Sequence, residues 1–106
     1  MGAKITEASI EKAGDAEATK LDAVVVKGNL RGRRGWPDKF YFFPGALLLL
    51  VEYKRPGEEP RKDQIKVHEK LRRRGFQVCV VDDAEVAKET IRRFVAGEVV
   101  DPEART

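Results

Sequence analysis

The sequence is poor in the residues that build disulfides and zinc sites. Its 106 residues include a single cysteine, Cys79, and a single histidine, His68. One cysteine excludes a disulfide within the chain, and one residue of each kind excludes the usual Cys/His zinc site. Any metal must therefore be held by carboxylates, and a reducing cytoplasm is the expected compartment. Cys79 itself is expected to pack as a small apolar side chain.

Long hydrophobic runs are also missing. The apolar stretch Leu47–Val51 falls far short of the roughly 20 residues that span a bilayer. The first residues lack a hydrophobic secretory region, so we expect neither a targeting signal nor a membrane partner. With 42% hydrophobic and 37% charged residues, the chain is expected to form one folded domain. We place that domain at residues 1–96, followed by a flexible tail at 97–106.

The net charge of +3 conceals an uneven distribution of charged residues. Residues 27–39 carry a local balance of +4, and residues 61–74 one of +5. Residues 82–106 are acidic, with a balance of −3. Two basic segments and an acidic end favour a surface that binds a polyanion such as nucleic acid. An ordinary solvated surface is the alternative interpretation.

Periodicity and turn residues predict an α/β fold with the order α-β-β-β-α-β-α. The third strand is apolar at nearly every position, which is typical of a central strand buried on both faces. Pro44-Gly45 joins the second and third strands as an antiparallel hairpin. Helices are expected from Glu7 to about Ala18, from Pro60 to Arg74, and after a cap at Asp82 or Asp83. The expected strands are residues 23–28, 38–43, 46–54 and 76–82.

Two charged residues follow the central strand directly, in the sequence LLLLVEYK. Side chains alternate along a strand, so Glu52 and Lys54 emerge on the same side. The hairpin brings Asp38 to the same edge, and the first helix can add Glu7. Converging carboxylates need a compensating cation, and Mg²⁺ is the ion suited to such oxygen ligands. A surface ion pair between Glu52 and Lys54 is the simpler alternative.

The segments GWPD, VEYK and DQIKVHEKLRRRGFQVCVV, in this order and spacing, resemble the VRR-NUC domain. This virus-type replication-repair nuclease is a branch of the PD-(D/E)xK superfamily, and the resemblance runs from about Thr6 to Asp82. It implies a restriction-endonuclease-like core with a central mixed sheet flanked by helices. The small stand-alone phage-type members match best in length, which implies the cytoplasm of a bacterial or phage-infected cell.

The resemblance also implies roles for individual residues. Asp38 and Glu52 would ligate Mg²⁺, for which Mn²⁺ substitutes, and Lys54 would be the catalytic lysine. Gln64 matches a glutamine that lies near the metal site. Glu7 matches the family's acidic residue on the first helix, and its inward position favours it over Glu11, although the choice stays open.

Several positions depart from the family pattern or admit two interpretations. His68 lies one turn after the glutamine on the same helical face, and a lone histidine there is more often packed than a ligand. Trp36 and Lys39 replace residue types that are more common in the family. Arg61 stands where a helix-capping Ser or Thr is common. None of these changes removes a catalytic group.

The basic residues around the GWPD segment and on the second helix are the expected contacts to DNA. Arginines fork onto phosphates, and an aromatic side chain either stacks on an unpaired base or anchors the loop. Recognition by shape and charge is expected, since no groove-reading element is apparent. The predicted contacts are Lys27, Arg31, Arg33, Arg34, Trp36, Lys39, Arg72 and Arg73.

The small phage-type members resemble Holliday-junction resolvases that act as homodimers. The resemblance therefore implies a metal-dependent endonuclease selective for branched DNA. A flap or nicking nuclease with the same active site is the alternative within enzymes. A non-catalytic DNA-binding module of the same fold is the alternative outside them, although such a module gains nothing from carboxylates near phosphate.

Overall fold

A five-stranded mixed sheet with the strand order β1-β2-β3-β4-β5 organises the chain. The computed structural model describes residues 5–28 and 30–104. Strands β1, β2 and β3 are antiparallel neighbours, whereas β3, β4 and β5 run parallel. The elements are α1 (Glu7–Lys20), β1 (Val24–Lys27), β2 (Lys39–Phe43), β3 (Leu47–Tyr53), α2 (Lys62–Arg73), β4 (Gln77–Val81), α3 (Ala84–Val95) and β5 (Glu103–Ala104).

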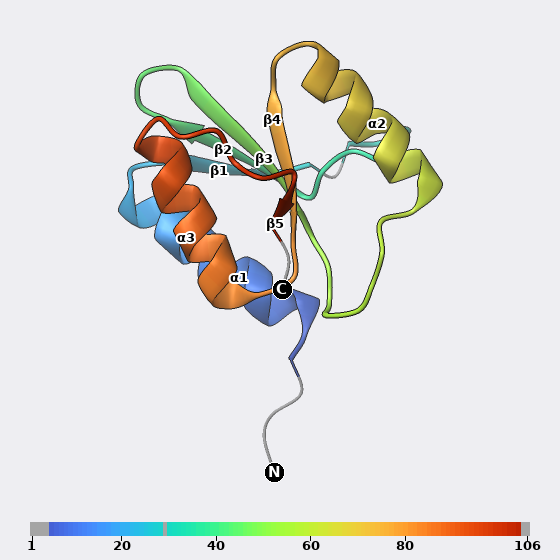
Figure 1. The fold of residues 1–106 in the computed structure, drawn as a ribbon, viewed down its shortest axis with the longest axis horizontal. Coiled ribbons are helices and arrows are strands. Elements are labelled where there is room, and N and C mark those ends of the chain that lie inside the picture. The colour runs from blue at the N-terminus through green and yellow to red at the C-terminus, as the bar shows by residue number, and fades with distance from the viewer. Residues whose placement is uncertain (1–4, 29, 105–106) are drawn as a thin grey trace.

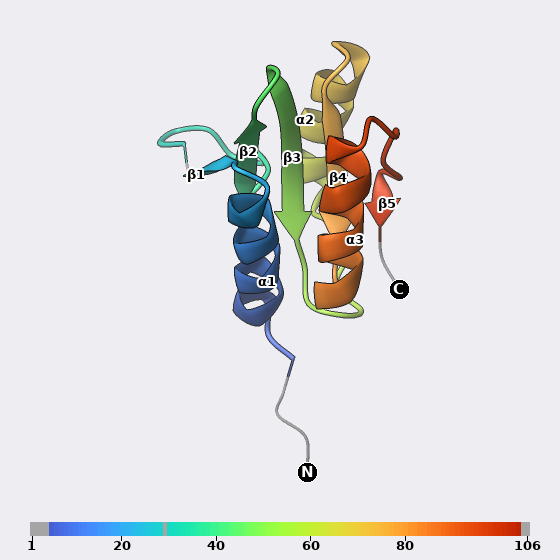
Figure 2. The same cartoon turned by 90° about the vertical axis from the view of Figure 1, so that its left-hand side faces the viewer.

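Helices cover both faces of this sheet. In Figure 1, α1 and α3 lie together on one side, while α2 stands apart on the other side, next to β4. The view turned by 90° shows α1 and α3 in front of the strands and α2 behind them (Figure 2). The mixed α/β architecture and the central position of β3 are as the sequence predicts. Among the described residues, no helix is long and apolar enough to cross a membrane.

The main core lies between the sheet and the pair α1 and α3. Alternate residues of β2, β3 and β4 point into it, because strand side chains alternate between faces. Helix α3 adds the inward-facing side chains that its periodicity predicts, with Ile91 and Phe94 at 1% and 4% exposure. The buried strand residues are Tyr41, Phe43, Leu49, Val51, Tyr53, Cys79 and Val81.

Side-chain caps fix where two of the helices begin. Thr6 accepts a hydrogen bond from the backbone N–H of Ser9 at 3.0 Å, which starts α1. Asp83 accepts from the backbone N–H of Val86 at 3.0 Å, so Asp83 and not Asp82 caps α3. Helix α2 begins at Lys62, two residues later than Pro60, the residue that the sequence placed in its first turn.

The segment after α3 departs from the sequence prediction. A flexible tail was expected over residues 97–106, of which 105 and 106 lie outside the described residues. Val100 and Ala104 are instead only 8% exposed, and Ala104 pairs with Val81 in the sheet. Burial of these two apolar side chains against the core stabilises the segment. The strand β5 has only two residues, which is too short for an alternating pattern to reveal it.

Candidate active site

Asp38 is fixed where the β2–β3 ladder ends. The last paired residues of that ladder are Lys39 and Val51, so the backbone N–H of Tyr53 has no strand partner in β2. It donates instead to Asp38 Oδ2 at 2.8 Å. Burial raises the pKa of Asp38, although this hydrogen bond acts in the opposite direction. The hairpin thus delivers Asp38 beside the end of β3, as the sequence predicts.

Glu52 is the most deeply buried carboxylate of this site, at 1% exposure. Its Oε2 accepts a hydrogen bond from Gln64 Nε2 at 2.9 Å. Its Oε1 is buried without a hydrogen-bond partner among the described residues. Burial, together with the negative charge of Asp38, raises the pKa of Glu52 to about 8. Without an added cation, this pair of carboxylates therefore resists full ionisation at neutral pH.

Lys54 supplies the positive charge nearest to Glu52. Its Nζ lies 3.5 Å from Glu52 Oε2 and 3.9 Å from Glu58 Oε1. Its backbone N–H donates to Val81 O at 2.9 Å, which continues the parallel pairing of β3 with β4. The lysine side chain is only 7% exposed, so its ammonium is held in a defined position. The ammonium acts to lower the pKa of Glu52, but burial and Asp38 outweigh it.

Glu7 approaches this pair from the first turn of α1. Burial, followed by the negative charge of Asp38, raises the pKa of Glu7. Glu11 instead forms an ion pair with Lys39, with 3.1 Å between its Oε1 and Lys39 Nζ. Within residues 5–28 and 30–104, no three His, Cys, Asp or Glu side chains form a group able to hold a metal ion. The predicted convergence is therefore a close pair, Asp38 and Glu52, with Glu7 nearby.

The Asp38–Glu52 pair fits a hard divalent cation. Mg²⁺ is commonly held by one or two carboxylates and completes its coordination with water and phosphate oxygens. A buried Oε1 without a partner on Glu52 is an acceptor that such an ion would satisfy. The charge repulsion that raises the pKa of Glu52 would be relieved by the same ion.

Helix α2 presents two buried side chains to Glu52, one turn apart. Gln64 accepts from the backbone N–H of Arg61 at 2.8 Å through Oε1, which leaves its amide to hold Glu52. His68 Nε2 lies 3.9 Å from Glu52 Oε1 and has no hydrogen-bond partner in the described part of the chain. Burial, with the charges of Arg72 and Lys54, lowers the pKa of His68 to about 4, so the ring is neutral at pH 7.

A cleft of about 380 Å³ opens beside Asp38 and Gln64. The loop between β1 and β2 forms one wall and the start of α2 forms the other. Of the predicted DNA contacts, those that line the cleft are Lys27, Arg33, Arg34 and Trp36. Arg31 is exposed on the same loop, and Arg73 is exposed on α2, where its Nη2 lies 3.6 Å from Glu69 Oε2.

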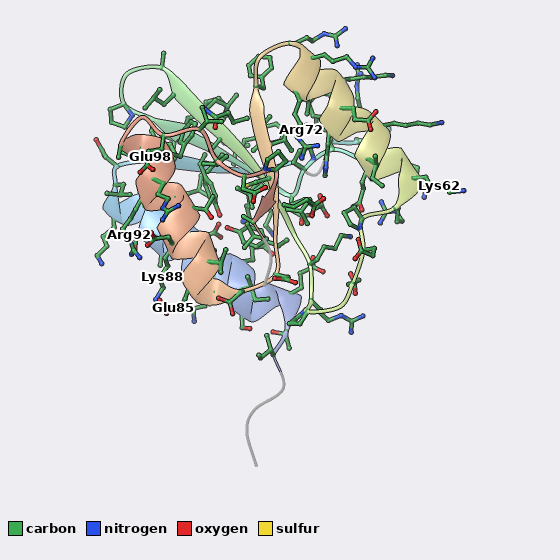
Figure 3. The ribbon with its side chains drawn as sticks, viewed as in Figure 1. Lys62, Arg72, Glu85, Lys88, Arg92 and Glu98 are labelled. Carbon is green, nitrogen blue, oxygen red and sulfur yellow. The ribbon has the colours of Figure 1, made fainter. Side chains whose placement is uncertain are left out.

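Two of the predicted DNA contacts are engaged inside the protein instead. Lys39 is only 4% exposed, and its Nζ lies 3.1 Å from Glu11 Oε1 and 3.0 Å from Asp15 Oδ2. Arg72 donates from Nε and Nη2 to Val78 O, at 3.1 and 2.9 Å. Figure 3 shows Arg72 directed from α2 toward the sheet, whereas Lys62 points outward. A lysine or arginine in a basic segment can face inward when oxygen acceptors lie there, so these two side chains have partners inside the protein, and their contact with DNA stays a prediction.

The sequence interpretation missed three residues around the site. Glu58 follows Lys54 by four residues, but it lies in a loop, so its contact with Lys54 Nζ can be seen only in the folded structure. Asp15 holds Lys39 and accepts from Tyr41 Oη at 2.7 Å. Arg61 lines the cleft, and the only signal for it was the absence of a capping Ser or Thr.

Comparison with known proteins identifies the family. The chain is 37% identical over 83 residues to "Putative nuclease p44" of Acyrthosiphon pisum secondary endosymbiont phage 1, covering 78% of this chain and 89% of that protein. A solved structure named "VRR_NUC domain" superposes with a TM-score of 0.76 at 28% identity, covering 85% of this chain and 97% of that one. The chain belongs to the VRR-NUC nuclease family.

A second solved structure supports the VRR-NUC fold at greater sequence distance. It is named "VRR_NUC domain protein" and superposes with a TM-score of 0.72 at 12% identity, over 96% of this chain and 98% of that one. At this identity the likeness concerns the fold alone. No family model matches the chain. Two chains with the VRR-NUC fold therefore share the arrangement of sheet and helices although most of their residues differ.

Proposed function

We propose that this chain is a metal-dependent endonuclease that hydrolyses phosphodiester bonds in branched DNA. The observation that carries the proposal is the buried Glu52 beside the partly buried Asp38, with the ammonium of Lys54 3.5 Å from Glu52 Oε2. When bound between these carboxylates, Mg²⁺ or Mn²⁺ would polarise a water molecule and stabilise negative charge on the phosphate.

The residues of the chain divide the remaining work. Gln64 holds Glu52 through the 2.9 Å hydrogen bond and so orients its carboxylate toward Asp38. Lys54 is a donor that can orient the attacking water or stabilise the charge that grows on the phosphate. Its ammonium carries three N–H donors, so it can reach an oxygen of the substrate while it stays beside Glu52 and Glu58.

Homodimerisation is part of the proposal, because two sites related by a two-fold axis suit symmetric cuts in a four-way junction. An apolar sheet face supports it. Val24 and Phe42 are paired across β1 and β2 and are 65% and 43% exposed, and Val26 on the same face is 40% exposed. Helix α2 packs on this face over β4, toward the other edge of the sheet (Figure 1). Exposed apolar patches of this kind mark protein interaction sites.

Cleavage assays test the chemistry. A labelled four-way junction, a 5′ flap and a linear duplex are incubated with Mg²⁺, Mn²⁺ or EDTA, using wild type and Lys54→Ala. Lys88→Ala is the matched control, since Lys88 lies on α3 across the sheet from α2 (Figure 3). We expect paired symmetric cuts in the junction that vanish with EDTA and in Lys54→Ala but persist in Lys88→Ala.

Other outcomes separate the parts of the proposal. Cuts confined to the flap would keep the active site and remove the resolvase assignment. Binding without cutting of any DNA would contradict the enzyme and leave a binding module. Sedimentation of wild type and Val24→Asp tests the dimer, because a charge at the centre of the apolar face should produce monomers.

A further inference from the structure

The cleft beside Asp38 has the dimensions of a small-ligand site. Its volume of about 380 Å³ falls within the range of roughly 300 to 1,000 Å³ that is usual for pockets that bind small molecules. A DNA duplex cannot enter a space of this size. The cleft opens next to the proposed metal ligands, so whatever occupies it lies adjacent to the scissile phosphate.

One wall of the cleft is aromatic and apolar. Trp36 is half-buried and packs against Phe40, with ring centroids 6.1 Å apart and planes tilted by 48°. Leu30 adds an aliphatic side chain to the same lining. A largely aromatic and aliphatic wall of this kind suits the flat face of a nucleobase.

The cleft is held open by contact between the loop and α2. Gly35 has φ +85°, and a Cβ at this position would press against the backbone of Asp63. Glycine therefore lets the loop rest directly on the first turn of α2. Arg34 adds an ion pair across the same junction, with Nε 3.7 Å from Asp63 Oδ2.

The lining of the cleft is rich in positive charge. Four cationic side chains contribute to it: Lys27, Arg33, Arg34 and Arg61. Two carboxylates also line it: Glu11 is paired at 3.1 Å with Lys39, which it shares with Asp15, and Asp38 belongs to the proposed metal pair. Arginines in such a position can bind a phosphate through forked hydrogen bonds and can stack on a base.

We propose that this cleft binds one unpaired nucleotide of the substrate, with its base against Trp36 and its phosphate against the loop arginines. The inference rests on the proposed nuclease function and specifies its substrate class further. A paired base would first have to leave its stack, at a cost of a few kcal/mol, before entering the cleft. DNA that already carries an unpaired nucleotide beside the scissile bond, as a branch point does, avoids that cost. The cleft thereby selects the place of cutting.

Trp36 provides the readout, because it is the only tryptophan in the chain. Lys54→Ala with Mg²⁺, and wild type in EDTA, are titrated with a duplex that carries a short single-stranded branch. The first unpaired nucleotide is either thymidine or an abasic residue. We expect quenching of Trp36 emission by the thymidine DNA and about tenfold weaker binding of the abasic DNA. Equal affinity for the two DNAs, or unchanged emission at saturation, would overturn the inference.

Variants test whether Trp36 is responsible. Measured by the anisotropy of fluorescently labelled DNA, Trp36→Ala should bind both DNAs with similar affinity, whereas Trp36→Phe should keep most of the tenfold preference because the ring remains. Phe76→Ala is the matched control, since Phe76 is 43% exposed just beyond the end of α2. A preference for the base that survives in Trp36→Ala would contradict the assignment.

Cleavage of the same DNAs by wild type with Mg²⁺ separates this inference from the nuclease proposal. Base-dependent quenching without cutting of any DNA would support the cleft and contradict the nuclease. Cutting at equal rates with and without the base, and with no quenching, would support the nuclease and overturn the cleft.

Discussion

The two faces of the sheet differ in whether their buried polar groups have hydrogen-bond partners. One face packs on α1 and α3, and the other packs on α2. On the first face, the hydroxyls of Tyr41 and Tyr53 lie 2.7 Å apart, and Tyr41 also donates to Asp15 at 2.7 Å. On the second face, Glu52 Oε1 and His68 Nε2 are buried with no hydrogen-bond partner among the described residues. Natural proteins pair nearly all their buried polar atoms, so unpaired ones need an explanation.

The contrast distinguishes residues that stabilise the fold from residues that belong to the proposed active site. Pairing of the tyrosine hydroxyls adds stability to the α1 and α3 side, because each buried polar group has its partner. The carboxylates of Asp38 and Glu52 cost stability while no cation is bound, since burial disfavours the charged form of both and the charge of Asp38 further disfavours that of Glu52. Substitutions on the two faces should therefore act in opposite directions on stability and on activity.

Glu52→Gln should produce the largest effect. It removes one of the two proposed metal ligands, so cleavage with Mg²⁺ should fall on the order of 1,000-fold, which corresponds to several kcal/mol of lost transition-state stabilisation. Stability in EDTA at neutral pH should rise, because the folded wild type must take up a proton at Glu52 and glutamine need not, while the new amide oxygen can still accept from Gln64. Initial cleavage rates and chemical denaturation measure the two effects. Glu98→Gln, on the exposed segment after α3, should change neither (Figure 3).

The pH dependence of stability tests the same carboxylate. The pKa of Glu52 is raised from 4.5 to about 8, so the folded protein binds a proton that the unfolded chain has released. The contribution of Glu52 to the free energy of unfolding in EDTA should therefore be fully present below about pH 4.5 and be lost as the pH rises to 8, by at most about 5 kcal/mol. Denaturation of wild type and Glu52→Gln at pH 5 to 9 measures it. Parallel profiles for the two proteins would refute the assignment.

Gly14→Ala should damage the opposite face. A Cβ at Gly14 would overlap the hydroxyl of Tyr53, so the helix or the strand must shift. Overpacking should lower the free energy of unfolding by about 2 kcal/mol, even though alanine favours the helix. Removing the hydroxyl with Tyr53→Phe in the same chain should recover part of the loss, as a double-mutant cycle would detect. Cleavage per folded molecule should stay near that of wild type.

The alternation of strands and the hairpin were enough to predict how Asp38, Glu52 and Lys54, the residues of the proposed active site, come together. Glu52 and Lys54 follow an apolar run, and the turn at Pro44-Gly45 can only return Asp38 to the same edge. The assignment of Gln64 came from the resemblance to the VRR-NUC domain, in which a glutamine follows the E-x-K segment on the next helix. The strand residues involved belong to neighbouring strands that one turn connects, so the sequence alone could predict their contact.

The partners of charged side chains could not be read in the same way. Lys39 and Arg72 lie in basic segments, and only the packing of α1 and β4 against them reveals the oxygens that they bind. The strand β5 forms because β4 offers an open edge, which is a property of the finished sheet. Glu58 approaches Lys54 through a loop, and loop geometry has no periodic signature.

Lys39→Met tests where the boundary between the two faces lies. Lys39 faces α1 but follows Asp38 directly, and burial alone would lower its pKa, whereas hydrogen bonds with Asp15 and Glu11 raise it. Removing the ammonium leaves these two carboxylates facing each other, though their side chains are 31% and 25% exposed. Thermal denaturation should show a loss of about 1 kcal/mol in the free energy of unfolding, with Lys12→Met on the exposed side of α1 as the control.

The same substitution should weaken DNA binding. Because Glu11 also lines the cleft, its freed charge should repel DNA and weaken binding a few-fold, more at low salt than at high salt. Unchanged stability with weakened binding would instead show that Lys39 contributes to DNA binding and not to the stability of the fold.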